Sequence, residues 1–530
     1  MRERFNTVAV AIPAQQFHVR CHVSIERQVP VMTDFAVRLL HLTGPLEVGA
    51  LREYFGLTGK ELIDLLDLLR SEGLVEESGG RLSLTSYAEA RFVGSSDGLP
   101  RFTRIVERQS RPTFELLSYT PISKALSGTY WDNTLELDWA SAAGGLGQTI
   151  ERAEAAFHQH FHDIERLEQD EDHRRAFSCY KVDSITSGRP FNVPLPVHFD
   201  VDVDGNVEFD VDAQLDLLPD ELRSTVRRLT ADRIGGLTSH VDHLKGFVDF
   251  FEDGLLARYL PERPSAASSQ SAVVRSGHKL VLRKPPEFDF STYVREIHAG
   301  ADGKVYDGDQ SRALLGALYM PKNQDRLVEA LTSAIQRFKK AASAEVVYPS
   351  KILWVIPDTD LWGRTELVRD LIERLSAAVA KVWGEPVELV GIAPAPQNEP
   401  VDRIRKRGNL LLDAGFNEVF LGPAISTFER FETLLLPGVY GAAMYQWKVP
   451  SMDVLSVPIG FGTHAPEKLR RIVSYSRNAG ARALHRVWRG SGKDGEDRKL
   501  KNAAGSAADF LYLESFAAGG AEDKGVGSDV

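Results

Sequence analysis

Short runs of consecutive apolar residues alternate with amphipathic stretches between residues 345 and 440, and this alternation constrains the fold most strongly. KILWVI at 351–356 and VELVGI at 387–392 are apolar throughout, and the stretch 365–383 between them has helical periodicity. Such strands are buried on both faces, so helices must cover both sides of the sheet. The sequence predicts an α/β layer with strands at 351–356, 387–392 and 418–421 and helices at 365–383, 401–414 and 428–436.

Composition sets limits on the class of protein. The 530 residues suffice for roughly two to four domains. No run of about 18 apolar residues occurs, so we expect no membrane span, and the first residues are too polar for a secretory signal. Cys21 and Cys179 give neither a disulfide framework nor a metal clamp, so we expect a cytoplasmic protein. With 63 basic and 74 acidic residues, any nucleic-acid binding requires a local basic patch.

The segment near the start has the pattern of three helices and a hairpin. The helices are expected at 34–41, 46–55 and 58–72, and Thr58 with Glu61 forms a capping box for the third. Two short strands follow around a Ser-Gly-Gly turn at 78–80. This order, with the phrase LLRSEGLVEESGGRLSLT, resembles a winged helix-turn-helix domain over residues 32–92.

The charge of this segment affects which kind of partner, DNA or protein, it can bind. Residues 33–92 contain ten acidic and six basic side chains. Phosphates supply much of DNA affinity, and acidic groups repel them. Two uses therefore stay open for the segment, namely contact with DNA and contact with another protein.

The most specific motif lies at the end of the α/β layer. It reads Gln446-Trp447-Lys448, four residues, Asp453, six residues, Gly460. These spacings are similar to those of the phospholipase D superfamily, which has His-x-Lys, Asp and Gly-Ser at the same offsets. The resemblance covers about residues 345–480, and Gln446 stands where the family has its nucleophilic histidine.

The resemblance implies a phosphate-binding pseudoenzyme. In the family the histidine attacks phosphorus and the lysine neutralises the phosphate oxygens, but a carboxamide cannot act as that nucleophile. A carboxamide can still donate hydrogen bonds to a phosphate. The expected phosphate-binding residues are Gln446, Lys448 and Asp453, with no catalytic residue and no cofactor. Family members with one lobe pair two copies, so the resemblance also implies a homodimer.

A basic stretch over residues 466–501 supports contact with nucleic acid. It contains eleven basic and four acidic residues, with Tyr475, His485 and Trp488 between them as stacking candidates. A second basic run occupies 403–407. The alternative is a solvated helix face beside acids from elsewhere in the fold. The expected nucleic-acid-binding residues are Lys468, Arg470, Arg471, Arg477, Arg482, Arg486 and Arg489.

Three patterns could hold a metal ion, but each has a simpler explanation. His158 and His162 have zinc-like spacing on an otherwise polar helix. Asp200, Asp202 and Asp204 match the opening of a calcium loop but fit a hairpin turn better. The pair Asp358 and Asp360 follows a strand, where an N-cap turn is the simpler interpretation. We therefore expect no metal site.

The chain is expected to be a multidomain α/β protein. The predicted parts are an N-terminal extension (1–31), a winged helix (32–95), a mixed α+β central region (96–261), a linker (262–277), a connecting region (278–344), a phospholipase D-like α/β lobe (345–480) and a basic segment with a disordered tail (481–530). The functional hypothesis is a DNA-binding accessory protein with other protein subunits, suited by analogy to a prokaryotic defence or DNA-maintenance complex. The alternatives are a metal-dependent nuclease and a protein-interaction scaffold.

Overall fold

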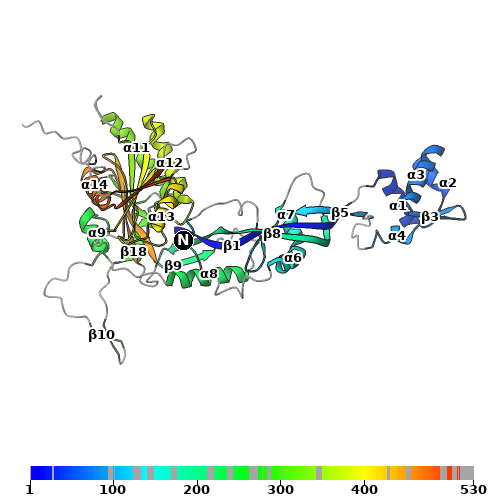
Figure 1. The fold of residues 1–530 in the computed structure, drawn as a ribbon, viewed down its shortest axis with the longest axis horizontal. Coiled ribbons are helices and arrows are strands. Elements are labelled where there is room, and N and C mark those ends of the chain that lie inside the picture. The colour runs from blue at the N-terminus through cyan, green and yellow to red at the C-terminus, as the bar shows by residue number, and fades with distance from the viewer. Residues whose placement is uncertain are drawn as a thin grey trace, which may run out of the picture.

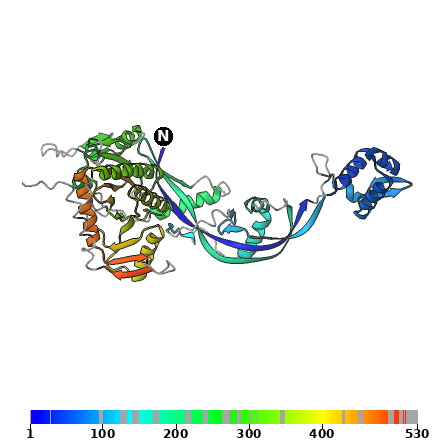
Figure 2. The same cartoon turned by 90° about the horizontal axis from the view of Figure 1, so that it is seen from above.

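The structure is a computed structural model that describes most of the chain. The residues described are 2–26, 29–93, 100, 102–122, 133–139, 149–168, 176–211, 220–235, 243–261, 273–276, 279–282, 288–300, 303–308, 310–341, 349–425, 430–448, 455–489, 498–503, 510 and 513. They form a mixed α/β protein with four sheets. Figures 1 and 2 show an α/β body, a long curved arm and a small module at the far end of the arm.

The arm is built on two long antiparallel strands, β1 (Arg2–Glu26) and β8 (Ala176–Asp202). At about 3.3 Å per residue, a strand of this length spans roughly 80 Å. The apolar side chains of β1 change from even to odd positions, from Val10 and Ile12 to Phe17 and Val19, where the register shifts between Gln15 and Phe17. This bulge therefore keeps the apolar face of β1 buried while the ribbon bends.

The near end of the arm shares an apolar core with the body, and its distal half has a core of its own. Near the body, β9 (Val207–Val211) pairs with β8, and α8 (Asp220–Gly235) packs beside it. The distal half of β1 pairs with β5 (Thr103–Ser110) and β6 (Thr113–Glu115), and β6 pairs with β7 (Pro121–Ile122). Helices α6 (Thr149–Gln159) and α7 (Phe161–Leu167) cover this part. The segment predicted as an N-terminal extension is thus the main strand of the arm.

The distal module has three principal helices and a three-stranded sheet. The elements are α1 (Val31–Thr43), β2 (Leu46–Glu47), α2 (Val48–Phe55), α3 (Gly59–Ser71), β3 (Val75–Ser78), β4 (Arg81–Leu84) and α4 (Ser86–Glu89), with strand order β2-β4-β3. The predicted capping box is confirmed, since Thr58 and Glu61 exchange hydrogen bonds at the start of α3. A core that includes Leu40, Leu51 and Leu69 belongs to this module.

The body is organised around a ten-stranded sheet with the order β12-β13-β19-β18-β17-β14-β15-β16-β20-β21. Strands β14 (Lys351–Val355), β15 (Glu388–Pro394) and β16 (Glu418–Gly422) are parallel. All other neighbouring pairs in this sheet are antiparallel. The remaining strands of the sheet are β12 (Val305–Tyr306), β13 (Ser311–Leu315), β17 (Phe431–Leu436), β18 (Tyr440–Lys448), β19 (Ser456–Thr463), β20 (His485–Arg489) and β21 (Arg498–Asn502).

Helices bury both faces of this sheet. One face packs against α11 (Pro321–Ala341), α12 (Leu367–Trp383) and α13 (Val401–Asp413). The other face packs against α9 (Leu244–Phe251), α10 (Phe290–Ala299), α14 (Pro466–Ala481) and the short helix η2 (Leu256–Tyr259). Alternate residues of β14 illustrate the division, because Trp354 belongs to the first layer and Leu353 to the second. The predicted double coverage of the apolar strands is confirmed.

Several sequence expectations differ from the structure. The helix predicted at 428–436 is wrong, since Phe431–Leu436 is strand β17, buried between β14 and β18. A short apolar run has no periodicity that separates a buried strand from a buried helix.

The sheet also extends beyond 345–480 on both sides, into the predicted connecting region and basic segment. Within the predicted linker, Val273–Ser276 forms β10, which pairs with β11 (Lys279–Leu282). Most of the predicted tail lies outside the described residues.

Among the helices that the structure describes, none combines the length and the apolar character that a bilayer crossing requires.

A substitution at Gly316 tests the packing of β1 against the body. Its φ is +88°, and a Cβ there would lie 2.9 Å from the Cα of Phe5 on β1. We expect Gly316→Ala to lower the free energy of unfolding of the body by about 2–4 kcal/mol, because both backbones resist displacement. Gly384→Ala is the matched control, with φ +83° and no atom within 4 Å, and should cost about 1 kcal/mol. Equal losses in chemical denaturation would contradict this packing argument.

Candidate functional site

Gln446 of the phospholipase D-like motif lies in the interior of the body. It is 4% exposed on β18, and its Nε2 donates a hydrogen bond to Oε2 of Glu432 at 3.3 Å. The hydroxyl of Ser456 donates to Oε1 of Gln446 at 3.4 Å. The carboxamide therefore bonds within the protein, and its nearest charged partner is a carboxylate.

Glu432 is the centre of this buried polar cluster. The indole N–H groups of Trp354 and Trp362 donate to its Oε1 at 2.9 and 2.8 Å. Burial raises the pKa of Glu432 to about 7, although the three donors favour the charged form. A carboxylate in this place would repel a bound phosphate whenever it is ionised, which counts against the anion pocket expected at Gln446.

Of the other two motif residues, the structure describes only Lys448. Lys448 is half-buried at the end of β18 and pairs in register with Ser456. Asp453 lies outside the described residues. Phe461 stands where the motif has its serine, and both Phe461 and Thr463 are fully buried.

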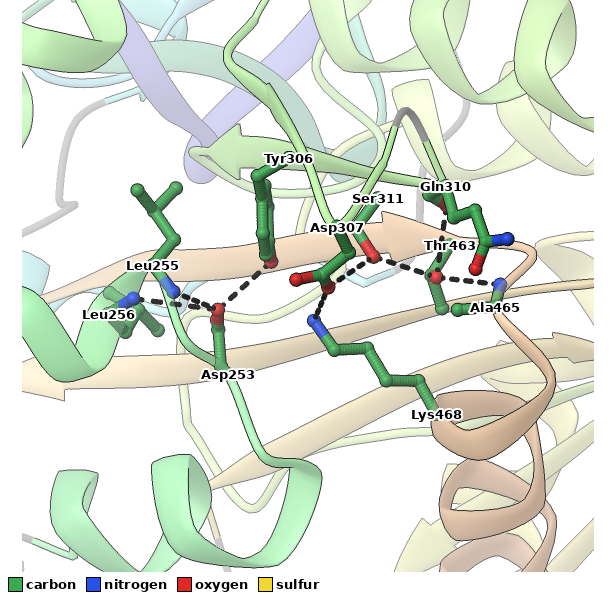
Figure 3. A network of polar contacts seen from close by, with 10 residues as sticks. All are labelled: Asp253, Leu255, Leu256, Tyr306, Asp307, Gln310, Ser311, Thr463, Ala465 and Lys468. Carbon is green, nitrogen blue, oxygen red and sulfur yellow. Dashed lines mark hydrogen bonds and ion pairs between the residues drawn. The ribbon is translucent and has the colours of Figure 1, made fainter.

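Lys468 was predicted to contact nucleic acid, and this prediction is wrong. Its side chain is 7% exposed, and its Nζ lies 2.6 Å from Oδ2 of Asp307 and over the ring of Phe461. Figure 3 shows it pointing into a polar network that also includes Asp253 and Tyr306. Burial raises the pKa of Asp253, and the positive charge of Lys468 opposes that rise. The lysine is therefore a structural ion-pair partner.

The same network holds Thr463. Its hydroxyl is 2.9 Å from that of Ser311, and it accepts the N–H of Ala465 at 3.0 Å (Figure 3). Asp307 accepts a hydrogen bond from Ser311 at 3.0 Å. These bonds connect β19 with the start of α14 and with the edge of the sheet, so the residues stabilise the body.

Most of the other predicted nucleic-acid-binding residues are engaged by groups of the body. Arg470 pairs with Glu467, Arg471 with Glu252, and Arg486 with Glu418. Arg489 donates to the carbonyl of Leu412 at 2.7 Å. Of the remaining two, Arg477 is half-buried and Arg482 is exposed at the end of α14. The net charge of the stretch is thus reduced by acids that are distant in sequence, as the alternative interpretation expected.

The candidate metal patterns are also dispersed. The helix predicted through the histidines breaks at His160, so His158 and His162 belong to different helices, α6 and α7. Asp202 accepts the N–H groups of Asp204 and Asn206 and closes the β8–β9 hairpin. Within the described part of the chain, no three His, Cys, Asp or Glu side chains are grouped so that they could hold a metal ion.

The best candidate site is a cleft of about 460 Å³ at the carboxyl ends of β14 and β15. Four segments of the chain line it, namely residues 133–136, Arg233 of α8, residues 356–364 after β14, and residues 393–411 after β15. The strands end here in Ile356-Pro357-Asp358 and Ala393-Pro394, where the apolar pattern stops. The open end of parallel strands is where α/β sheets bind their ligands.

Arginines from three elements converge in this cleft. Arg364 donates from Nη1 to the carbonyl of Thr134 at 2.6 Å, and Asn133 holds the same loop through the carbonyl of Gly363 at 2.9 Å. Burial lowers the pKa of Arg364, and the positive charges of Arg233 and Arg407 lower it further, against Asp360 and Glu136. Arg364 is therefore close enough to Arg233 and to Arg407 for their charges to act on it, and an anion beside Arg364 would relieve that repulsion.

Arg407 and Glu399 form the polar wall of the cleft. Arg407 donates to the carbonyl of Pro394 at 2.7 Å and to Oε1 of Glu399 at 3.2 Å. The second oxygen of Glu399, Oε2, is buried and has no hydrogen-bond partner among the residues that the structure describes. An unpaired buried carboxylate oxygen is costly, so this wall also offers an acceptor to a ligand that carries a donor.

Arg403 and Lys406 lie at the mouth of the cleft on the first turns of α13. Both side chains are exposed, and neither is paired with an acid within the described residues. The sequence marked this run as a second basic cluster, and it also marked Asp358 and Asp360. Arg233, Arg364 and residues 133–136 were missed, because only the tertiary fold brings these distant segments together.

Comparisons with protein-family models, curated proteins and solved structures gave no match to this chain. The assignment of the cleft as a site therefore depends on its geometry alone.

The protonation of Glu432 gives the body a specific pH dependence. Its folded pKa is about 7 and its ordinary value is 4.5, so the unfolded chain loses this proton first. The unfolding free energy should therefore fall by about 3 kcal/mol between pH 4.5 and 7 and then level off. The Glu432→Gln variant should not show this pH-dependent fall in unfolding free energy, because its amide oxygen can accept hydrogen bonds from both tryptophans at any pH.

Chemical denaturation between pH 5 and 8 checks this expectation. Glu432→Gln should gain stability relative to the wild type as pH rises, whereas the exposed Glu373→Gln should follow the wild-type curve. A constant difference between Glu432→Gln and wild type over this range would show that Glu432 does not titrate there.

Proposed function

We propose that the protein binds nucleic acid in the cleft at the carboxyl ends of β14 and β15 and takes the end of a strand there. The observation that carries the proposal is the convergence of Arg233, Arg364 and Arg407 from three separate elements. Guanidinium groups recognise phosphate through paired hydrogen bonds, so their convergence favours a phosphate ligand.

The size and polarity of the cleft support a nucleotide rather than an isolated phosphate ion. A cleft of about 460 Å³ has the volume of a small-molecule site and is too small for a duplex. Glu399 Oε2 provides a buried acceptor for a sugar hydroxyl or a base amino group, next to Arg407. A terminal nucleotide carries both a phosphate and such donors.

In this proposal the protein is an accessory factor rather than a phosphodiesterase. The resemblance of the Gln446 motif to the phospholipase D superfamily supports an origin in phosphate chemistry. The phosphate contact itself is assigned here to the arginine cleft, because Gln446 bonds to Glu432. Further protein subunits, a homodimer and a role in a prokaryotic defence complex stay part of the proposal.

One observation favours a metal-dependent nuclease as the second candidate. Asp358 and Asp360 line the same cleft as the arginines, and two carboxylates beside a bound phosphate could share a divalent cation with it. Cleavage of DNA that requires Mg²⁺ or Mn²⁺ and disappears in Asp358→Ala would select this alternative over the accessory role.

Exposed bases at the mouth of the cleft give the test of nucleic-acid binding. The double variant Arg403→Ala/Lys406→Ala should bind a fluorescent 5′-phosphorylated single strand about tenfold more weakly, with a salt dependence reduced by roughly 0.7 per lost contact. Fluorescence anisotropy at several salt concentrations measures both quantities. Arg405→Ala is the matched control, since Arg405 is exposed on the same helix but pairs with Asp402 and does not line the cleft.

A circular single strand of the same composition tests the preference for ends. It should compete poorly with the linear strand, because it has no terminal nucleotide to enter the cleft. Equal binding by the double variant and the wild type, or equal weakening by Arg405→Ala, would contradict the proposal.

A further inference from the structure

The two cysteines of the chain are neighbours in the distal half of the arm. Cys21 lies on β1, and Cys179 lies on β8 in a distant part of the sequence. Val23 of β1 pairs in register with Cys179, so the two cysteines lie diagonally across the strand pair. The sequence contains no other cysteine, and the fold therefore brings both of its thiols together.

Both side chains lie on the same face of the ribbon. Cys21 is fully buried in the apolar core beneath α6 and α7, and Cys179 packs against that core while it stays half-buried. The thiol of Cys21 donates a hydrogen bond to the sulfur of Cys179. That sulfur also accepts the backbone N–H of Lys181. The two sulfur atoms are therefore within reach of each other, and Cys179 is the more accessible of the two.

The ribbon is irregular at this position. The register between β1 and β8 shifts between Arg20 and Cys21 and again between His22 and Val23. Such irregularities interrupt the ladder of backbone hydrogen bonds, so the strands resist small displacements less than a regular pair does. We therefore expect the backbone to accommodate the approach of the sulfur atoms to the length of a disulfide bond, about 2.0 Å.

The environment of the thiols affects the rate and the equilibrium of their oxidation in opposite ways. Burial raises the pKa of both thiols, and that of Cys21 rises to about 12. Because the thiolate is the reacting form, oxidation should be slow at neutral pH and faster at higher pH. A dithiol whose thiolates are not stabilised favours the disulfide at equilibrium, so the product should be stable once it has formed.

We propose that a small hydroperoxide oxidises Cys21 and Cys179 to a disulfide that joins β1 to β8 within one chain. The thiolate of Cys179 attacks an oxygen of the O–O bond, which breaks and leaves a sulfenic acid and, after proton transfer, an alcohol or water. The thiolate of Cys21 then attacks the sulfenic sulfur and releases its oxygen as water. Two thiols are thus oxidised while one peroxide bond is reduced.

The disulfide would lie near the end of β1 that leads to the distal module, and it would fix the register of the two strands there. Oxidation would therefore stiffen the arm without a change in the body. This inference does not depend on the proposed function of the cleft.

Hydrogen peroxide is the probe, applied to the full-length native protein at pH 8.5. The wild type should lose both thiols, and mass spectrometry should find the peptide of Cys21 joined to that of Cys179 within one chain. Dithiothreitol should restore both thiols. At pH 7 the reaction should be roughly thirtyfold slower, because the thiolate fraction falls tenfold for each pH unit below the pKa. Hydrogen exchange around the two cysteines should slow in the oxidised protein.

The variants Cys21→Ala and Cys179→Ala are matched controls that separate the two steps. In Cys21→Ala the sulfenic acid at Cys179 has no thiol beside it, so dimedone should trap it. In Cys179→Ala the buried Cys21 should react at least about tenfold more slowly than Cys179 does in Cys21→Ala. Neither variant should show the slower hydrogen exchange after peroxide.

Three results would overturn the proposal. One is a wild type whose thiols stay unchanged after peroxide at pH 8.5. The second is a disulfide between two chains in place of the internal bond. The third is dimedone-labelled or further oxidised Cys179 in the wild type as often as in Cys21→Ala, since Cys21 would then not reach it.

Discussion

Burial of β14 and β15 on both faces is the constraint on which the body depends. Their side chains pack alternately into two helical layers, so the polar residues that follow these two strands gather where the strands end. At that edge the apolar residues Val355 and Ile392 end the strands, and polar residues follow them, namely Asp358, Arg364 and the start of α13. The cleft is therefore a direct consequence of sheet burial, and α8 with residues 133–136 supplies its remaining wall.

The long ribbon of β1 and β8 sets the arrangement of everything outside the body. Its bulges let one apolar stripe pack near the body and another pack under α6 and α7. The ligand cleft that we propose thus lies in the body, far from the module at the tip of the arm. The close approach of Gly316 to Phe5 fixes the near end of this ribbon.

Local patterns predicted the local elements well. The helices of the distal module, the capping box at Thr58 and the strands at 351–356 and 387–392 follow from periodicity and capping, which act over a few residues. The alternation in VAVAI near the start could have identified β1, but its partner lies more than 150 residues away. The strand at 431–436 was mistaken for a helix because it is buried on both faces.

Predictions about the site were weaker, because charges were counted along the sequence rather than in space. Lys468 meets Asp307, Arg471 meets Glu252, and Arg486 meets Glu418, so the positive charge of the basic stretch is partly neutralised. Motif spacing singled out Gln446, but it could not reveal Glu432 beside it. The arginine cleft combines four distant segments, and only the run at 403–407 and the pair Asp358 and Asp360 gave a signal in the sequence.

Photocrosslinking of a 5′-phosphorylated strand with a reactive base at its terminal nucleotide tests the central claim most directly. Mass spectrometry should find the crosslinks in residues 356–364 and 393–411, around the arginine cleft. Crosslinks confined to α3 or to residues 466–489 would contradict the account.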